Sequence, residues 1–287
     1  MTWEETIQMI REKPKYEGLV ENAYFDADLP LNIERYYSGE EYHEIKQWLK
    51  QLGIYRGKIL DIGSGNGVSA VSFARDGFEV DALEPDPSDT IGAGAIRSLK
   101  AHYNLDNISI HESFAEDIGF PDNQFDLVFV RQALHHANNL QKFVAESYRV
   151  LKPGGYMITV RDHVVYDEKD KEWFLEMHPL HKFYGGENAF HPEEYEKAFT
   201  SAGFKIKKRY KYFDSIVNFF PAKKEQIDTK LKKEKAKKRF NEAYPGLKRL
   251  PFSGQLYLNY LKLRGFSFDN NEMKIPGRMY SYILKKA

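Results

Sequence analysis

Apolar residues recur along the chain with two different spacings from residue 57 onward. Short, continuous apolar runs are typical of buried strands, and they occur at 58–63, 78–85, 108–111, 125–130 and 156–162. Between these runs, apolar residues three or four positions apart predict amphipathic helices at 66–76, at 90–103 and from 138 to the glycine pair Gly154–Gly155. Strands that alternate with helices predict parallel pairing with right-handed crossovers, and therefore an α/β fold with a doubly wound sheet.

The pattern outside this core predicts two further parts. Residues 1–54 have the spacing of helices throughout and are expected to form a helical N-terminal lid. A basic and aromatic insertion, predicted to be helical, occupies 214–275. The core is then made of 55–213 together with 276–287, which supplies the last strand, RMYSYILKK.

Composition and charge narrow the class of protein. Lys plus Arg and Asp plus Glu are both 42, so the net charge is zero and no overall field favours nucleic acid or an anionic membrane. Cysteine is absent, which excludes disulfides, thiolate zinc sites and a cysteine nucleophile. The N-terminus is charged and no apolar run approaches the roughly 18 residues of a membrane span. We therefore expect a cytoplasmic protein without a signal peptide.

A glycine-rich turn follows the first predicted strand. Gly63, Gly65 and Gly67 come directly after Asp61, in the sequence KILDIGSGNGV. Such a turn lets the backbone approach a ligand without Cβ contact, and the helix behind it offers free N–H groups. Glu84 closes the next strand, where doubly wound folds hold ribose hydroxyls with a carboxylate. A dinucleotide fingerprint would need glycine at position 68, which is Val68, so a nicotinamide cofactor is disfavoured.

Four segments in order resemble the class I S-adenosylmethionine-dependent methyltransferases across roughly residues 55–165. They are LDIGSGNG, LEPD, SFAEDIGFPDNQFDLVFVRQALHH and VLKPGGYMITV. The resemblance implies a Rossmann-like, seven-stranded methyltransferase sheet and S-adenosyl-L-methionine as cofactor. Many relatives carry an Asp for the adenine amino group where this chain has Phe114, so stacking or backbone contacts are expected there instead.

The resemblance also implies a set of cofactor-binding residues. The first motif and the ribose-binding acid supply most of them, the loop before the fourth strand supplies the adenine side, and the end of that strand and the lid supply the rest. They are Asp61, Gly63, Ser64, Gly65, Asn66, Gly67, Glu84, Pro85, Ala115, Glu116, Arg131, Arg35 and Tyr36.

Four titratable residues follow two neighbouring predicted strands. His135 and His136 come after 125–130, and Asp162 and His163 end the next strand. Methyl transfer to a hydroxyl requires removal of its proton, and histidine is the usual base. Sugar and natural-product O-methyltransferases resembled by this chain place a histidine at the first position and an acid at the second. The sequence therefore predicts a methyltransferase acting on a hydroxyl of a sugar, glycan precursor or natural product, and leaves open which of the four acts.

Two alternatives stay open. One is a methyltransferase acting on RNA or protein, although the zero net charge and the absence of an Asn-Pro-Pro-Tyr-type motif after the fourth strand disfavour RNA. The other is an inactive cofactor-binding fold that serves as a partner module, which the intact glycine turn disfavours. His178, His181 and His191 lack supporting acids or cysteines at metal-ligand spacing, and no metal is assigned.

The segment 222–249 is strongly basic. It carries eleven Lys or Arg against four Asp or Glu, a difference of +7. A lysine-rich run is most often a solvated helix face. The other interpretation is a lid that attracts a phosphate- or sugar-bearing small-molecule acceptor, since the aromatic residues Phe252, Tyr257, Tyr260 and Phe266 follow it.

Overall fold

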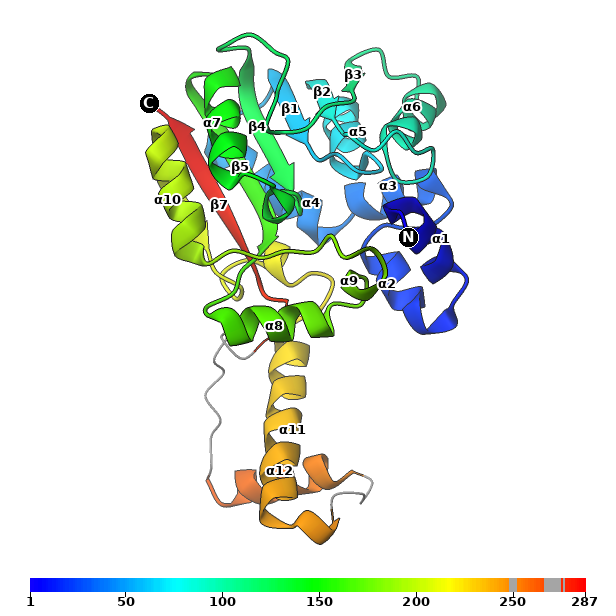
Figure 1. Ribbon diagram of the computed structural model, residues 1–287, viewed down its shortest axis with the longest axis vertical. Helices are drawn as coiled ribbons and strands as arrows, with labels where there is room; N and C mark the ends of the chain where they lie inside the picture. The colour runs from blue at the N-terminus through cyan, green and yellow to red at the C-terminus, as the bar shows by residue number, and fades with distance from the viewer. Residues whose placement is uncertain (248–251, 266–274, 276) are drawn as a thin grey trace.

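A seven-stranded mixed sheet forms the centre of the computed structural model, which describes residues 1–247, 252–265, 275 and 277–287 (Figure 1). The strand order is β3-β2-β1-β4-β5-β7-β6. The strands are β1 Lys58–Ile62, β2 Glu79–Leu83, β3 Ile108–His111, β4 Phe125–Arg131, β5 Leu151–His163, β6 Phe204–Tyr210 and β7 Met279–Lys286. Pairings are parallel from β3 to β5, and β7 is antiparallel to both β5 and β6. The predicted α/β, doubly wound, seven-stranded fold is confirmed.

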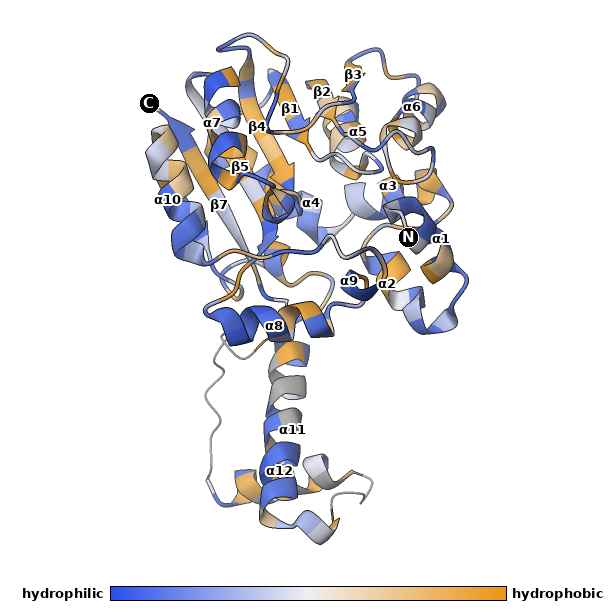
Figure 2. Ribbon diagram, viewed as in Figure 1, coloured by the Kyte–Doolittle hydropathy of each residue, from blue (hydrophilic) through white to orange (hydrophobic). Residues whose placement is uncertain are grey.

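Helices cover both faces of the sheet, because the strand side chains that point to either face are apolar. On β4, Leu127 and Phe129 pack with the helices α4 Glu40–Gln51, α5 Val68–Arg75 and α6 Ala93–His102. Val128 and Val130 pack with α7 Leu140–Val150 and α10 Pro192–Ala202 on the opposite face. Strands buried on both faces are typical of a parallel sheet. Figure 2 shows these strands as hydrophobic segments between the helices.

One predicted boundary is wrong. The helix expected to continue to the glycine pair ends at Val150, and β5 already begins at Leu151. Pro153 explains the difference, because a proline disfavours helical geometry at the residue before it. Leu151 pairs with Phe125, and a register shift follows before Leu127 pairs with Tyr156, so Gly154 lies within the irregular start of the strand rather than at a helix end.

The N-terminal region is helical, as expected. It contains α1 Trp3–Arg11, α2 Glu17–Asn22, α3 Leu29–Tyr37 and α4. Glu41 of α4 is fully buried and accepts hydrogen bonds from Arg131 at the end of β4, at 2.7 and 3.1 Å. Arg161 of β5 lies 3.4 Å from the same carboxylate. The region is therefore joined to the sheet by a buried ionic network.

The remaining helices lie after β5. They are α8 Glu168–Met177, α9 His181–Tyr184, α11 Lys224–Ala243 and α12 Ser253–Leu263. Short 3-10 helices lie before β5 at Pro14–Tyr16 and Leu134–His136, and after it at Ile216–Asn218 and Pro245–Leu247. The α11–α12 hairpin extends away from the sheet (Figure 1). It has a small apolar contact of its own, formed by Ala236, Leu258 and Leu261. None of the helices in the described ranges is long and apolar enough to cross a membrane.

Candidate functional site

A cavity of about 360 Å³, called here the first cavity, lies beyond the carboxyl ends of β1, β2 and β4. Its wall is made of the glycine turn, the residues after β2, the loop after β3 and the residues after β4. The predicted site residues among its lining are Gly63, Ser64, Gly65, Asn66, Glu84, Pro85, Ala115, Glu116, Arg131 and His136. Crevices at this edge of a doubly wound sheet are where such folds bind their ligands.

The turn after β1 requires glycine at its first position. Gly63 has a φ of +67°, which side chains rarely adopt, and a Cβ there would collide with the Cβ of Ala133. Ala133 belongs to the segment after β4, so the bare backbone lets the two strand ends approach each other. Gly67 caps α5 with a φ of +86° and does not itself line the cavity.

Asp61 is fully buried directly before the turn. Its Oδ2 accepts a hydrogen bond from the Ser69 hydroxyl at 2.7 Å, and its Oδ1 has no partner among the described residues. Burial raises the pKa of Asp61 to about 6, against the effect of that hydrogen bond. The carboxylate does not line the first cavity. It lies behind the turn, in the protein interior, and its Oδ1 can still accept a hydrogen bond.

Glu84 lines the first cavity and is 7% exposed. Its Oε2 accepts the Gly65 N–H at 2.7 Å and its Oε1 accepts the Asp86 N–H at 2.9 Å. Burial raises the pKa of Glu84 to about 7 despite these two hydrogen bonds. Each carboxylate oxygen has two lone pairs, so both can accept a further hydrogen bond from a ligand hydroxyl.

Aromatic side chains from the N-terminal region cover the first cavity. Trp3 and Phe25 line it, with ring centroids 5.5 Å apart, and Tyr184 of α9 lies 4.7 Å from Trp3. The two residues predicted from this region lie elsewhere. Tyr36 is fully buried in the core, and Arg35 pairs with Asp26 at 3.3 Å. Trp3 was missed from the sequence, although a tryptophan at the start of an amphipathic helix was an available signal.

The loop after β3 forms another side of the first cavity. Phe114 lines it and is 61% exposed, which leaves its ring free to stack on a planar ligand. Glu116 accepts the backbone N–H groups of Asn138 and Asn139 at 2.9 and 3.2 Å. These bonds attach the loop to the start of α7, so Glu116 holds the wall in place.

The two neighbouring histidines lie in different surroundings. His136 lines the first cavity, and its Nδ1 lies 3.0 Å from the carbonyl oxygen of Gly186. A carbonyl only accepts, so this Nδ1 carries the proton and Nε2 is left as an acceptor. His135 is buried, with Nδ1 3.1 Å from Asp162 Oδ1 and Nε2 3.7 Å from Glu187 Oε2. Burial would lower the pKa of His135, but its two carboxylate neighbours outweigh this and raise it to about 9.

A second cavity, of about 320 Å³, adjoins the first. The two share Ala23 and Gln132 in their lining, and His163 and His178 line the second one together with Phe174. His163 is buried, which lowers its pKa well below the usual range. His163 therefore faces a different space from His136, although the two follow adjacent strands.

The basic segment lies apart from both cavities. No described residue of α11 or α12 lines either of them. The hairpin pairs with itself and projects from the sheet, which is why the lid interpretation does not match its position (Figure 1). Lys248, Arg249 and Phe266, which belonged to that interpretation, lie outside the described residues.

Comparison with known proteins identifies similar chains. A methyltransferase domain family matches residues 60–159. The chain is 34% identical over 113 residues to a ubiquinone/menaquinone biosynthesis C-methyltransferase of Psychromonas ingrahamii, covering 38% of this chain and 44% of that protein. It is 30% identical over 207 residues to a sterol 24-C-methyltransferase of Yarrowia lipolytica, and the match covers 67% of this chain and 52% of that protein. The chain thus matches about half the length of these curated relatives.

A solved structure shares the fold. Geranyl diphosphate C-methyltransferase of Streptomyces coelicolor, determined with S-adenosyl-L-homocysteine, superposes with a TM-score of 0.55 at 14% identity. The match covers 86% of this chain and 76% of that one. At this level of identity the likeness shows the fold alone, and it agrees with the sheet described above.

Proposed function

Residues 60–159 form a methyltransferase domain of the class I S-adenosylmethionine-dependent family, and we propose that the chain transfers a methyl group to a hydroxyl of a small molecule, such as a sugar, glycan precursor or natural product. The observation that carries the proposal is the pair of adjoining cavities. The first contains the glycine turn and the ribose-type acid, and the second is beside it at Gln132. An acceptor in the second cavity would lie next to a cofactor in the first.

The residues of the first cavity fit S-adenosylmethionine, the cofactor of this family. Gly63, Ser64 and Gly65 bring the turn after β1 to the cavity wall, Asp61 supports this turn from behind, and Glu84 offers carboxylate oxygens to the two ribose hydroxyls. Phe114 and Ala115 supply an apolar wall for the adenine. The bound cofactor supplies a methyl group that is already activated for in-line displacement, which requires alignment more than covalent help.

Among the four predicted catalytic residues, His136 is the one we propose as base. Its Nδ1–H donates to the Gly186 carbonyl, which fixes the ring and leaves Nε2 as the proton acceptor at the first cavity. The hydroxyl of an acceptor that extends from the second cavity past Gln132 would give its proton to this Nε2 as its oxygen attacks the methyl carbon, and S-adenosylhomocysteine would leave with the electron pair of the broken sulfur–methyl bond. His135 is buried between two carboxylates and does not line the cavity, so it is assigned a supporting role with Asp162.

A nucleophilic carbon is a second candidate for the methylated atom. It is favoured by the two relatives reported above, at 34% and 30% identity, which are C-methyltransferases by name. Methylation of an activated carbon also needs a proton acceptor, so His136 would keep its role. The macromolecule alternative is less well supported, because Trp3 and Phe25 of the N-terminal region cover the first cavity.

The proposal is tested by methyl transfer from ¹³C-methyl-labelled S-adenosylmethionine to a panel of sugars, phenols and polyketide alcohols. The carbon chemical shift of the labelled product separates an O-methyl from a C-methyl group. We expect an O-methyl product, and we expect His136→Ala to lower kcat by about 10²–10⁴-fold with little change in cofactor affinity. His102→Ala, a change at an exposed histidine on α6, is the control and should keep full activity. A C-methyl product would contradict the assignment of a hydroxyl as the acceptor. Full activity of His136→Ala would contradict the assignment of His136 as the base.

A further inference from the structure

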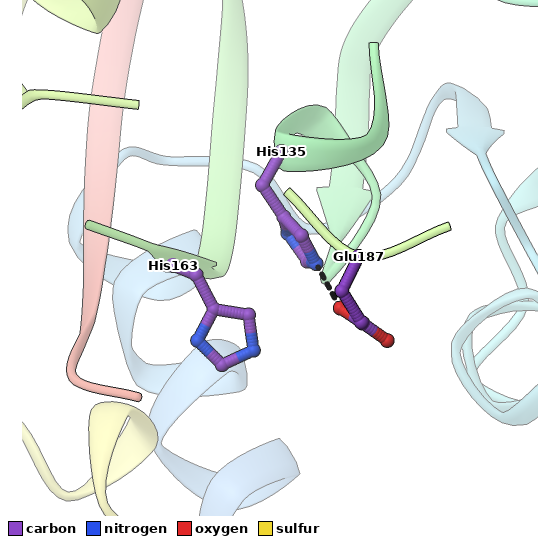
Figure 3. A group of neighbouring side chains, drawn as sticks. All are labelled: His135, His163 and Glu187. Atoms are coloured by element: carbon purple, nitrogen blue, oxygen red, sulfur yellow. Dashed lines mark ion pairs between the residues drawn. The ribbon is translucent and has the colours of Figure 1, made fainter. Parts of the chain in front are cut away.

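Three ligand-type side chains from separate segments meet in a buried position beside the second cavity. His135 follows β4, His163 ends β5, and Glu187 lies after α9 (Figure 3). One nitrogen or oxygen atom of each lies within 4.8 Å of those of the other two. All three side chains are buried, with Glu187 the most accessible at 9% exposure. No metal was predicted from the sequence because these residues are far apart in it, and Glu187 was not among the predicted site residues.

The orientation of His135 directs its Nε2 toward a carboxylate oxygen of Glu187. Its Nδ1 lies 3.1 Å from Asp162 Oδ1, which also accepts the backbone N–H of His135. With a metal ion bound the ring is neutral, so this carboxylate would hold the ring proton on Nδ1 and direct the lone pair of Nε2 toward Glu187 Oε2, 3.7 Å away. That separation is too long for a hydrogen bond. A cation between the two atoms would satisfy both.

Other polar atoms of the cluster lack partners. The Nδ1 atoms of His163 and His178 are buried without a hydrogen bond to any described residue. His178 Nδ1 lies 3.6 Å from the other oxygen of Glu187. An unsatisfied buried polar group costs roughly 1–3 kcal/mol, so a ligand that bonds to these nitrogens would stabilise the site.

We propose that His135, His163 and Glu187 bind a divalent transition-metal ion of the zinc class. Two imidazoles and one carboxylate are an established zinc-binding set in which a further position stays open. Ligand atoms around a tetrahedral zinc ion lie about 3.3 Å apart, given bonds of about 2.0–2.1 Å. The 4.8 Å limit observed here leaves at most about 1.5 Å to be closed by side-chain rotation.

The surroundings of the cluster match those of metal ligands. Histidine ligands usually donate their second N–H to a carboxylate, which fixes their orientation. Asp162 does this for His135, and the Tyr184 hydroxyl donates to Glu187 Oε1. Asp162 is thus a positioning residue of the metal site rather than a ligand.

The position of the proposed ion indicates a role in binding the acceptor. His163 lines the second cavity, so the open coordination position would face the space assigned to the acceptor. A metal ion there would bind an acceptor oxygen and lower its pKa, as a Lewis acid does. This role rests on the proposed function, whereas the metal site itself does not.

The alternative to a bound metal ion is a second proton on the His135 ring. If His135 is an imidazolium, it forms ion pairs with Asp162 and Glu187 and no metal is needed. The two possibilities differ in a property that can be measured without any acceptor or cofactor, namely stoichiometric binding of a metal ion by the protein.

Metal binding is tested on the full, untagged chain after treatment with a chelator. The protein is titrated with Zn²⁺ in competition with a chromophoric chelator, and separately with Co²⁺ while its visible absorption is recorded. We expect one equivalent of either ion and a Co²⁺ spectrum of four or five coordination. His163→Ala and Glu187→Gln should each weaken Zn²⁺ binding at least 100-fold, and Asp162→Asn should weaken it about 10–100-fold.

The matched control is His43→Ala combined with His102→Ala, which removes two exposed histidines outside the cluster and should leave binding unchanged. Affinity for S-adenosylhomocysteine reports whether each variant is folded. A wild-type chain that binds no stoichiometric Zn²⁺ or Co²⁺ would overturn the metal site and leave the proton-held network. A folded Glu187→Gln variant that binds Zn²⁺ with wild-type affinity would overturn the assignment of Glu187 as a ligand. Neither result would bear on methyl transfer itself.

Discussion

Glu84 exchanges its proton near neutral pH, because burial raises its pKa to about 7. Ribose hydroxyls donate to a carboxylate, so cofactor binding favours the ionised form. Affinity for S-adenosylhomocysteine should therefore be weak well below about pH 7 and rise as the pH passes through that value. Titration calorimetry from about pH 5.5 to about pH 8.5 measures this dependence. Glu84→Gln should remove the part of the rise centred near pH 7, and an unchanged pH profile in that variant would contradict the assignment.

Gly63 illustrates how one glycine lets two strand ends approach each other. An alanine there has to adopt a φ of +67° and also meets Ala133. Gly53 has a φ of +75°, and an added methyl group there would have nothing within 4 Å, so Gly53→Ala is the matched control for backbone strain alone. Gly63→Ala should lower the free energy of unfolding by about 1–3 kcal/mol more than Gly53→Ala does. Urea unfolding measures the free energy of unfolding of both variants. Equal losses would mean that a methyl group at position 63 causes no steric clash with Ala133.

The attachment of α4 to the sheet depends on Glu41. Its buried carboxylate lies against two buried arginines, Arg131 and Arg161. Glu41→Gln leaves that positive charge uncompensated, so we expect a loss of about 3–5 kcal/mol in the free energy of unfolding. Glu40→Gln, at an exposed position of the same helix, should change it by less than about 0.5 kcal/mol. Denaturant unfolding of the two variants compares them directly, and similar small losses would show that the network contributes little.

For the molecule as a whole, the sequence predicted the sheet and most of the first cavity. Strands β1 to β5 contain the continuous apolar runs, and the turn from Gly63 to Gly67 and the acid Glu84 stand next to two of them in sequence. Local pattern was therefore enough to place them. The start of β5 was missed because the helical spacing continues beyond Val150, and the proline effect at Pro153 outweighs it.

Residues brought together only by folding were not predictable in the same way. Glu187 lies in a polar loop without periodicity, and its importance follows from its position beside His135 and His163. The different roles of His135 and His136 depend on which partner each ring meets, Asp162 or the Gly186 carbonyl. Trp3 reaches the first cavity from the N-terminal helix through tertiary packing against Phe25 and Tyr184.

Calorimetric titration of the protein with S-adenosylhomocysteine asks whether the first cavity is a methyltransferase cofactor site, on which every other assignment depends. We predict one site per chain with micromolar affinity. Glu84→Ala should weaken binding by roughly 1.5–3 kcal/mol, about 10–150-fold, through loss of charge-assisted hydrogen bonds. Glu79→Ala, at the exposed start of the same strand, should bind like the wild type. Absence of binding to the wild-type protein, or unchanged affinity in Glu84→Ala, would contradict the assignment of this cavity.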